Sequence, residues 1–136
     1  YKRQGMDRIA NEGIRFTQGF CTAATSTPSR YSVMTGLYPW TSKDAKILPG
    51  NAALIIDTEK ITLPKLMKQA GYATGSIGKW HIGLGDGNVD WNKDVHPGAA
   101  EIGYDYSFIQ AATNDRVPCV FLENGRVVGL DPNDPL

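Results

Sequence analysis

The sequence has few of the features that mark specialised classes of protein. It holds only two cysteines in 136 residues, too few for a disulfide framework and spaced like no zinc module. Its 14 basic and 14 acidic side chains balance, which argues against general nucleic-acid binding. No apolar run approaches the roughly 20 residues of a membrane-spanning helix. We therefore expect a globular chain with no nucleic-acid partner and no membrane span, whose function comes from local chemistry.

Both ends of the sequence lack the elements expected of a complete domain. The chain opens at Tyr1 with no initiator methionine and no signal-peptide pattern. The pattern predicts a helix over residues 6–13 and a short strand over 14–17, with no strand before the helix. Residues 131–136 are rich in turn-forming residues. We expect residues 1–136 to be an internal piece of a larger α/β domain, incomplete at both ends.

A helix, a glycine turn and a strand follow one another in the middle of the chain. The helix is expected over 62–71, with Thr62 as N-cap and apolar residues at helical spacing, which predicts one buried stripe. This stripe consists of Leu63, Leu66, Met67 and Ala70. The strand, expected over 72–78, leads into polar residues at its carboxyl end, the usual layout of an open α/β active site. Further on, an Asn-Gly pair between apolar runs predicts a hairpin over 117–130.

The segment Ser26-Thr27-Pro28-Ser29-Arg30 carries the first chemical signal. Pro28 fits the first turn of a helix, and Ser29 or Thr27 can cap it. Ser26 then lies at a helix N-terminus, where free N–H groups favour an anion, and Arg30 can add further donors. A hydroxyl beside such a cradle suggests transfer of a phosphoryl or sulfuryl group. A plain helix cap followed by a surface arginine is the alternative interpretation.

A lysine and a histidine two residues apart form the second signal. Lys79 and His81 stand at the end of the predicted strand. Residues i and i+2 of an extended backbone point to the same side, so we expect these side chains to converge. A cation beside a titratable imidazole suits stabilisation of an anionic transition state together with proton transfer. An exposed lysine beside a hydrogen-bonded histidine is the alternative.

Together the two segments resemble a known family. Residues 26–37, from Ser-Thr-Pro-Ser-Arg to Met-Thr-Gly-Leu, resemble the activation signature of the type I, formylglycine-dependent sulfatases. Residues 71–83, with Gly-Tyr-Ala-Thr and Gly-Lys-Trp-His-Ile-Gly, are similar to their second signature. The stretches 6–16 and 103–108 also resemble family segments, in the same order. The resemblance is to arylsulfatase-like members of the alkaline-phosphatase-like superfamily, and it implies part of an α/β sandwich with a mixed central sheet flanked by helices.

The resemblance also implies a site and a mechanism. Ser26 would be oxidised by a maturation enzyme to formylglycine, whose hydrate attacks the sulfur of a sulfate ester. Arg30 would orient the hydrate, Lys79 would contact it and the sulfate oxygens, and His81 would assist release of sulfate. A calcium ion would bind residue 26 and a sulfate oxygen. Serine-type members depend on a radical, oxygen-independent maturase, although an engineered cysteine-to-serine change would give the same sequence.

Most calcium ligands of such enzymes would fall outside this sequence, as acidic pairs before Tyr1 and beyond Leu136. Asp86, Asp90 and Asp94 could bind a cation, but we interpret them as solvated loop acids. This piece would hold the nucleophile end of the site and lack most carboxylate ligands. We therefore expect the chain to be inactive on its own.

Substrate and location follow only from the family resemblance. It implies a sulfate ester, preferably of a sulfated glycan, and a periplasmic or secreted location. Asp115 and Arg116 could bind substrate, because arginine binds carboxylates and sulfates bidentately, or could form a surface ion pair. Two alternative functions stay open: a phosphatase or phosphodiesterase that uses unmodified Ser26, and a non-catalytic sulfate-binding domain.

Overall fold

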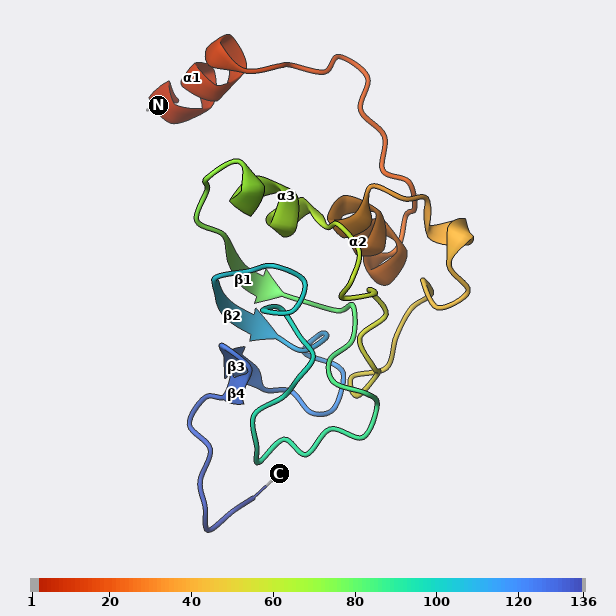
Figure 1. Cartoon of the computed structure of the whole chain (residues 1–136), viewed down its shortest axis with the longest axis vertical. Coiled ribbons are helices and arrows are strands. Elements are labelled where there is room, and N and C mark those ends of the chain that lie inside the picture. Colours follow the sequence, from red (N-terminus) through yellow and green to blue (C-terminus); the bar gives the residue numbers. More distant parts are fainter. Residues whose placement is uncertain (1–2, 136) are drawn as a thin grey trace.

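A four-stranded mixed sheet lies at the centre of the molecule (Figure 1). The structure is a computed structural model that describes residues 3–135. The strands follow the order β1-β2-β3-β4; β1 and β2 are parallel, and the other two pairs are antiparallel. Their bounds are β1 (Gly75–Lys79), β2 (Tyr106–Gln110), β3 (Phe121–Glu123) and β4 (Arg126–Val127). This mixed sheet, with helices beside it, confirms the predicted α/β class.

The helices divide into a pair beside the sheet and one that stands apart. Their bounds are α1 (Gln4–Glu12), α2 (Ser26–Thr35), the 3₁₀ helix η1 (Pro39–Thr41) and α3 (Leu63–Gln69). In Figure 1, α2 and α3 lie side by side next to β1, whereas α1 stands away from the sheet at the end of an extended segment. The prediction of a strand over 14–17 is wrong. A strand needs a neighbouring backbone, and no described backbone group pairs with this segment.

Helix α3 begins where the sequence predicts but buries different residues. Thr62 is its N-cap, and the Thr62 hydroxyl accepts a hydrogen bond from the Lys65 N–H at 3.5 Å. The prediction that the apolar stripe is buried is wrong: Leu63 is 43% exposed and Leu66 is 52% exposed. The buried side chains at this end of the helix are Thr62 and Pro64. The stripe therefore lies on the solvent-exposed side of α3 among the described residues.

The core lies between one face of the sheet and the segments that follow β1. Successive side chains of a strand point to opposite faces. Ile109 is 2% exposed and Leu122 is 0% exposed, whereas Ile77, on the other face, is 77% exposed. The buried face packs against apolar residues outside the strands, namely Trp80, Ile82, Leu84, Val95, Ala99 and Ile102. This packing fixes the chain just after β1, where the second predicted motif lies.

The C-terminal hairpin has shorter strands than the sequence suggests. Strands β3 and β4 lie within the predicted range 117–130 and pair with Leu122 opposite Val127. Asn124 has φ of 48° and Gly125 has φ of 87°, the left-handed values that a type I′ turn needs at both central positions. The rest of the predicted range lies outside the strands.

Candidate active site at the start of α2

Ser26 is the first residue of α2 and is half-buried. Its position at the helix N-terminus agrees with the predicted one, but the capping is different. The N-cap residue is Thr25, which makes no side-chain cap bond. The Thr27 hydroxyl, predicted as one possible cap, instead donates to the backbone carbonyl of His81 at 2.7 Å. Among the described residues, the backbone N–H groups of Ser26 and Thr27 donate no hydrogen bond, as is usual in the first turn of a helix, and they can serve an anion.

The Ser26 hydroxyl lies between two side chains. Arg30 Nε donates to Ser26 Oγ at 3.1 Å, and His81 Nδ1 lies 2.9 Å from the same oxygen. His81 Nε2 lies 2.9 Å from the Leu48 carbonyl oxygen, which can only accept, so Nε2 carries a hydrogen. In the neutral ring Nδ1 is then an acceptor. Ser26 therefore donates to His81 and accepts from Arg30, the arrangement of a hydroxyl beside a base.

Burial favours the neutral form of His81. The residue is 3% exposed, and loss of water around the ring lowers its pKa. The hydrogen bond to the Leu48 carbonyl acts in the opposite direction, while the positive charges of Lys79, Arg116 and Arg30 lower the pKa further. An imidazole that stays neutral can accept a proton from the Ser26 hydroxyl.

Positive charge dominates the surroundings of this hydroxyl. Burial lowers the pKa of Lys79, and the nearby Arg30 guanidinium lowers it further. Asp115 raises the Lys79 pKa and Arg116 lowers it, so both residues lie within electrostatic range of the site. Among residues 3–135 the Lys79 ammonium donates no hydrogen bond, whereas one end of the Arg30 guanidinium donates to the Lys79 carbonyl at 2.7 Å. Such a group of cations suits a small anion.

The reason why His81 reaches Ser26 differs from the prediction. The prediction of an extended backbone through Lys79 and His81 is wrong. β1 ends at Lys79, and His81 has a left-handed φ of 56°. The N–H groups of Trp80 and His81 both donate toward the end of β2, to the carbonyls of residues 110 and 111 at 2.9 and 3.0 Å. A local turn of the backbone therefore directs the imidazole toward Ser26.

Gly83 shows why the second motif ends in glycine. Its φ is 83°, and a Cβ built there would lie 1.8 Å from the Ala53 carbonyl oxygen. The Gly83 carbonyl also accepts a 2.7 Å hydrogen bond from the Trp80 indole. A larger residue would push the segment around Ala53 away from the site. The motif therefore includes one residue selected for close packing rather than for chemistry.

Sequence reasoning missed two contributors to the site. Leu48 acts through its backbone carbonyl, which any residue type would provide, so the sequence carried no signal for it. Thr27 was recognised only as a possible cap, although its buried hydroxyl reaches the second motif.

The acidic loop residues have other partners. Asp90 pairs with Lys93 at 3.0 Å and Asp94 with Arg126 at 2.7 Å, while Asp86 accepts from the backbone N–H of Asn88. Within residues 3–135, no group of three or more His, Cys, Asp or Glu side chains is placed to hold a metal ion. These findings agree with the interpretation of the three aspartates as ordinary loop acids.

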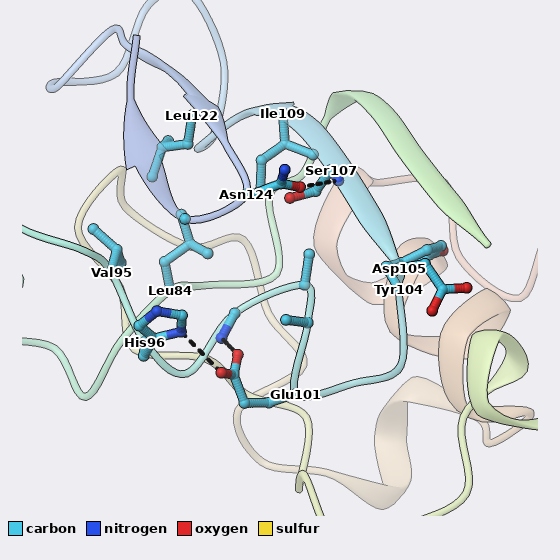
Figure 2. A pocket seen from close by; sticks show the side chains of 14 residues that line it. Leu84, Val95, His96, Glu101, Tyr104, Asp105, Ser107, Ile109, Leu122 and Asn124 are labelled. Carbon is cyan, nitrogen blue, oxygen red and sulfur yellow. Dashed lines mark hydrogen bonds and ion pairs between the residues drawn. The ribbon is translucent and has the colours of Figure 1, made fainter. Parts of the chain in front are cut away.

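A separate small cavity of about 90 Å³ lies on the buried face of the sheet. Figure 2 shows His96 and Glu101 pointing toward one another at its edge, with Nδ1 and Oε1 2.8 Å apart, and Ile109 and Leu122 on its apolar side. The other Glu101 oxygen accepts from the Gly98 N–H at 2.5 Å. The polar groups at this edge of the cavity therefore bond to one another.

The fold and the site define an α/β domain in which a helix-terminal hydroxyl, a neutral histidine and several cations meet at the carboxyl end of a parallel strand. The sulfatase family model matches residues 1–117 of this chain. The chain therefore belongs to the sulfatase family, which confirms the family predicted from the two motifs.

Individual relatives cover the chain to different extents. An N-acetylgalactosamine-6-O-sulfatase of Bacteroides thetaiotaomicron is 56% identical over 132 residues, 96% of this chain and 26% of the relative. Human arylsulfatase H is 41% identical over 86 residues, 58% of this chain and 15% of the relative. A solved structure from a study of glycosaminoglycan metabolism by Bacteroides thetaiotaomicron is 55% identical, with a TM-score of 0.86, and covers 97% of this chain and 28% of that one. The chain thus spans about a quarter of the length of the curated relative that it matches over most of its residues.

Proposed function

We propose that the full-length protein hydrolyses sulfate esters of a glycan at the Ser26 site. One observation carries this proposal: Ser26 Oγ lies 3.1 Å from Arg30 Nε and 2.9 Å from His81 Nδ1, at the N-terminus of α2. The site therefore offers a reactive hydroxyl, a proton acceptor and binding groups for an anion. Membership of the sulfatase family selects sulfate among the possible anions.

The residue at position 26 would act as formylglycine rather than as serine. Conversion of the serine CH₂OH to an aldehyde removes two hydrogens, which a radical maturase would accept. The surroundings of Ser26 fit this modification, because one donor and one acceptor flank a half-buried oxygen. The hydrated aldehyde would supply the hydroxyl that attacks sulfur.

Each neighbouring side chain has a distinct part in the proposed reaction. Arg30 donates to the oxygen at position 26 and stabilises negative charge there. His81 Nδ1 takes a proton from a hydroxyl of residue 26, and the Leu48 carbonyl holds the tautomer that makes this possible. Lys79 provides a positive charge for the sulfate oxygens. The net reaction consumes one water molecule, breaks the ester bond and yields an alcohol and sulfate.

Calcium is part of the proposal, but the described residues do not form a calcium site. Calcium takes six to eight oxygen ligands, whereas the side chains that contact the Ser26 hydroxyl are Arg30 and His81, which offer nitrogen atoms. Residue 26 would contribute one ligand, and carboxylates from outside the 136 residues would provide the others. The residue roles given above do not depend on the ion.

The substrate class is proposed from the relatives and from two residues near Lys79. The relative with 56% identity is named for 6-O-sulfated N-acetylgalactosamine, which makes a sulfated amino sugar the first substrate to test. Asp115 and Arg116 would bind the sugar, since both act electrostatically on Lys79. Arg116 Nε is buried and has no hydrogen-bond partner among residues 3–135.

A periplasmic or secreted location is proposed because it is the usual location of sulfatases of this family. No helix among residues 3–135 is long and apolar enough to cross a bilayer. Fractionation of the native host would locate the protein.

The test of this function combines mass spectrometry with kinetics of the full-length protein. The peptide that contains residue 26 should be lighter by two hydrogens than the same peptide with an unmodified serine. The protein should release sulfate from 6-O-sulfated N-acetylgalactosamine, and Ser26→Ala should not. Hydrolysis of phosphate esters by protein with an unmodified serine would instead support the phosphatase alternative. Binding of sulfate without turnover would support the non-catalytic one.

The 136-residue chain is expected to be inactive by itself, because it supplies few of the carboxylates that calcium needs. Release of sulfate by the purified chain would contradict this expectation.

A further inference from the structure

Two hydrogen bonds join α2 to the backbone that carries Lys79 and His81. Thr27 Oγ1 donates to the His81 carbonyl at 2.7 Å, and Arg30 Nη1 donates to the Lys79 carbonyl at 2.7 Å. Thr27 is 0% exposed, so water does not compete for its hydroxyl. The helix that presents Ser26 therefore also holds the segment that presents His81.

The backbone needs this support because it leaves regular strand geometry at His81. The φ of 56° at His81 is uncommon for a residue with a side chain. The N–H groups of Trp80 and His81 are both bonded to carbonyls at the end of β2. The carbonyls of Lys79 and His81 are instead bonded by side chains of α2. A buried carbonyl without a hydrogen-bond donor is unfavourable, and when the donor is removed the peptide plane can rotate.

We propose that Thr27 is a positioning residue that aligns His81 with the reactive group at position 26. The proposal rests on the proposed function, since it assigns Thr27 a part in the same reaction. The Thr27 hydroxyl fixes the peptide plane between residues 81 and 82, and this plane helps to set the direction of the His81 side chain. The imidazole then lies 2.9 Å from Ser26 Oγ on one side and 2.9 Å from the Leu48 carbonyl on the other.

Arg30 cannot replace Thr27 in this role. Its Nη1 holds the carbonyl two residues earlier, and its Nε is bonded to Ser26. Only Thr27, among the described residues, has a side chain that reaches the His81 carbonyl. Small errors in the placement of a catalytic group reduce rates strongly, by about 10²-fold for a displacement of about 1 Å. Loss of the Thr27 hydroxyl should therefore change kcat more than KM.

The first test compares Thr27→Val and Thr27→Ser in the full-length protein, with rates expressed per formylglycine found by mass spectrometry. Valine keeps the shape and removes the hydroxyl, so kcat should fall by about 10- to 100-fold while KM changes by less than about threefold. Serine restores the donor and should recover kcat to within about threefold of the wild type. If the valine variant does not fold, Thr27→Ala provides the same comparison.

Thr62→Val is the matched control. Thr62 is 1% exposed, and its hydroxyl likewise donates to a distant backbone carbonyl, that of Ile102, but it lies outside both motifs. This variant should lower thermal stability and leave kcat within about twofold of the wild type. A kcat for Thr27→Val within about twofold of the wild type, or an equal loss of kcat in Thr62→Val, would overturn the proposal.

Crystal structures of the full-length wild type and Thr27→Val separate this proposal from the proposed function. The distance from His81 Nδ1 to the residue 26 oxygen should lengthen beyond about 3.5 Å in the variant. An unchanged distance would overturn the positioning role even if sulfate is released. Absence of sulfate release by the wild type would overturn the proposed function, while a lengthened distance would still support the positioning role.

Discussion

Helix α1 and the junction between α2 and β1 both lie within the matched family region, yet they differ in how they are held. No residue of α1 is buried, and its side-chain contact is an exposed ion pair between Arg8 and Glu12 at 3.0 Å. Helix α2 buries Thr27 and Tyr31 and donates two side-chain hydrogen bonds to the backbone, one at the last residue of β1 and one two residues beyond it. Similarity to a family therefore identifies both segments but does not show which of them is packed.

The difference indicates which regions of the structure are stabilised by contacts among the described residues themselves. The apolar side chains of α1, such as Met6 and Ile9, are 73% and 74% exposed, so the helix has no burial to stabilise it here. The junction of α2 and β1 has its own hydrogen bonds and an apolar core beneath it. Helix α1 makes no contact with another described helix or strand, so substitutions in α1 can serve as controls for those at the junction.

The largest effect is expected for His81→Ala in the full-length protein. Removal of the imidazole takes away the proton acceptor 2.9 Å from Ser26 Oγ, and kcat for sulfate release should fall by about 10²- to 10⁴-fold. Ile9→Ala in α1 serves as the control and should change kcat by less than about twofold. Steady-state kinetics on a sulfated sugar provide the measurement. A loss of less than about tenfold for His81→Ala would show that another group accepts the proton.

The same change at two isoleucines tests the packing difference directly. Ile109 is 2% exposed in the core, so Ile109→Ala should reduce the free energy of unfolding by about 2–5 kcal/mol. Ile9 is 74% exposed, and Ile9→Ala should change the free energy of unfolding by less than about 0.5 kcal/mol. Urea titration followed by circular dichroism measures both. A cost above about 1.5 kcal/mol at Ile9 would show that another part of the protein covers α1.

The two regions also differ in how well the sequence predicts them. The two motifs group Ser26, Arg30 and His81 in one expected site, and in the structure Arg30 and His81 both contact the Ser26 hydroxyl. The position of the helix that became α1 was predicted as well, because apolar spacing and a terminal glycine are local signals. The exposed stripe of α3 and the missing strand over 14–17 were not predicted. Burial and strand pairing depend on neighbours that local patterns do not specify.

Other details of the site depend on tertiary contacts that have no sequence signal. The left-handed backbone at His81 results from bonds to β2 and α2, whereas the residue type alone favours an ordinary conformation. The Leu48 carbonyl fixes the His81 tautomer, and a carbonyl is common to all residues. A motif can therefore identify reacting groups while the contacts that orient them stay unpredicted.

A conservative change at Arg30 should have a smaller effect than loss of His81. Arg30→Lys keeps the charge but cannot bond both Ser26 Oγ and the Lys79 carbonyl, which the guanidinium holds at 3.1 and 2.7 Å. The kcat/KM of the full-length protein should fall by about 10- to 100-fold, since hydrogen bonds from charged groups contribute about 1.5–3 kcal/mol. Arg8→Lys in α1 is the matched control, because its ion pair is exposed. Equal kcat/KM values for the two variants would contradict the role of the planar guanidinium.

The smallest effect is expected for the contribution of ion pairs to stability, in a comparison of the pair beside the sheet with the pair in α1. Lys68 lies 2.6 Å from Asp105, whose carboxylate also accepts from the Thr74 N–H and hydroxyl at 2.9 and 3.0 Å. The Lys68 bond, followed by those from Thr74, lowers the Asp105 pKa to about 2. Because the folded pKa lies below the unfolded value of 3.8, the carboxylate stabilises the fold above about pH 4, and this stabilisation is lost as the pH falls toward 2.

Asp105→Asn should therefore lower the thermal midpoint at pH 6 and flatten its decline between about pH 4 and 2, as measured by circular dichroism. Glu12→Gln, which removes the exposed pair in α1, should leave both the midpoint and its pH dependence nearly unchanged, because water screens that pair. The contrast would fail if the two variants gave the same curve. In that case the contact between α3 and the start of β2 would contribute no more to stability than an ion pair on an isolated helix.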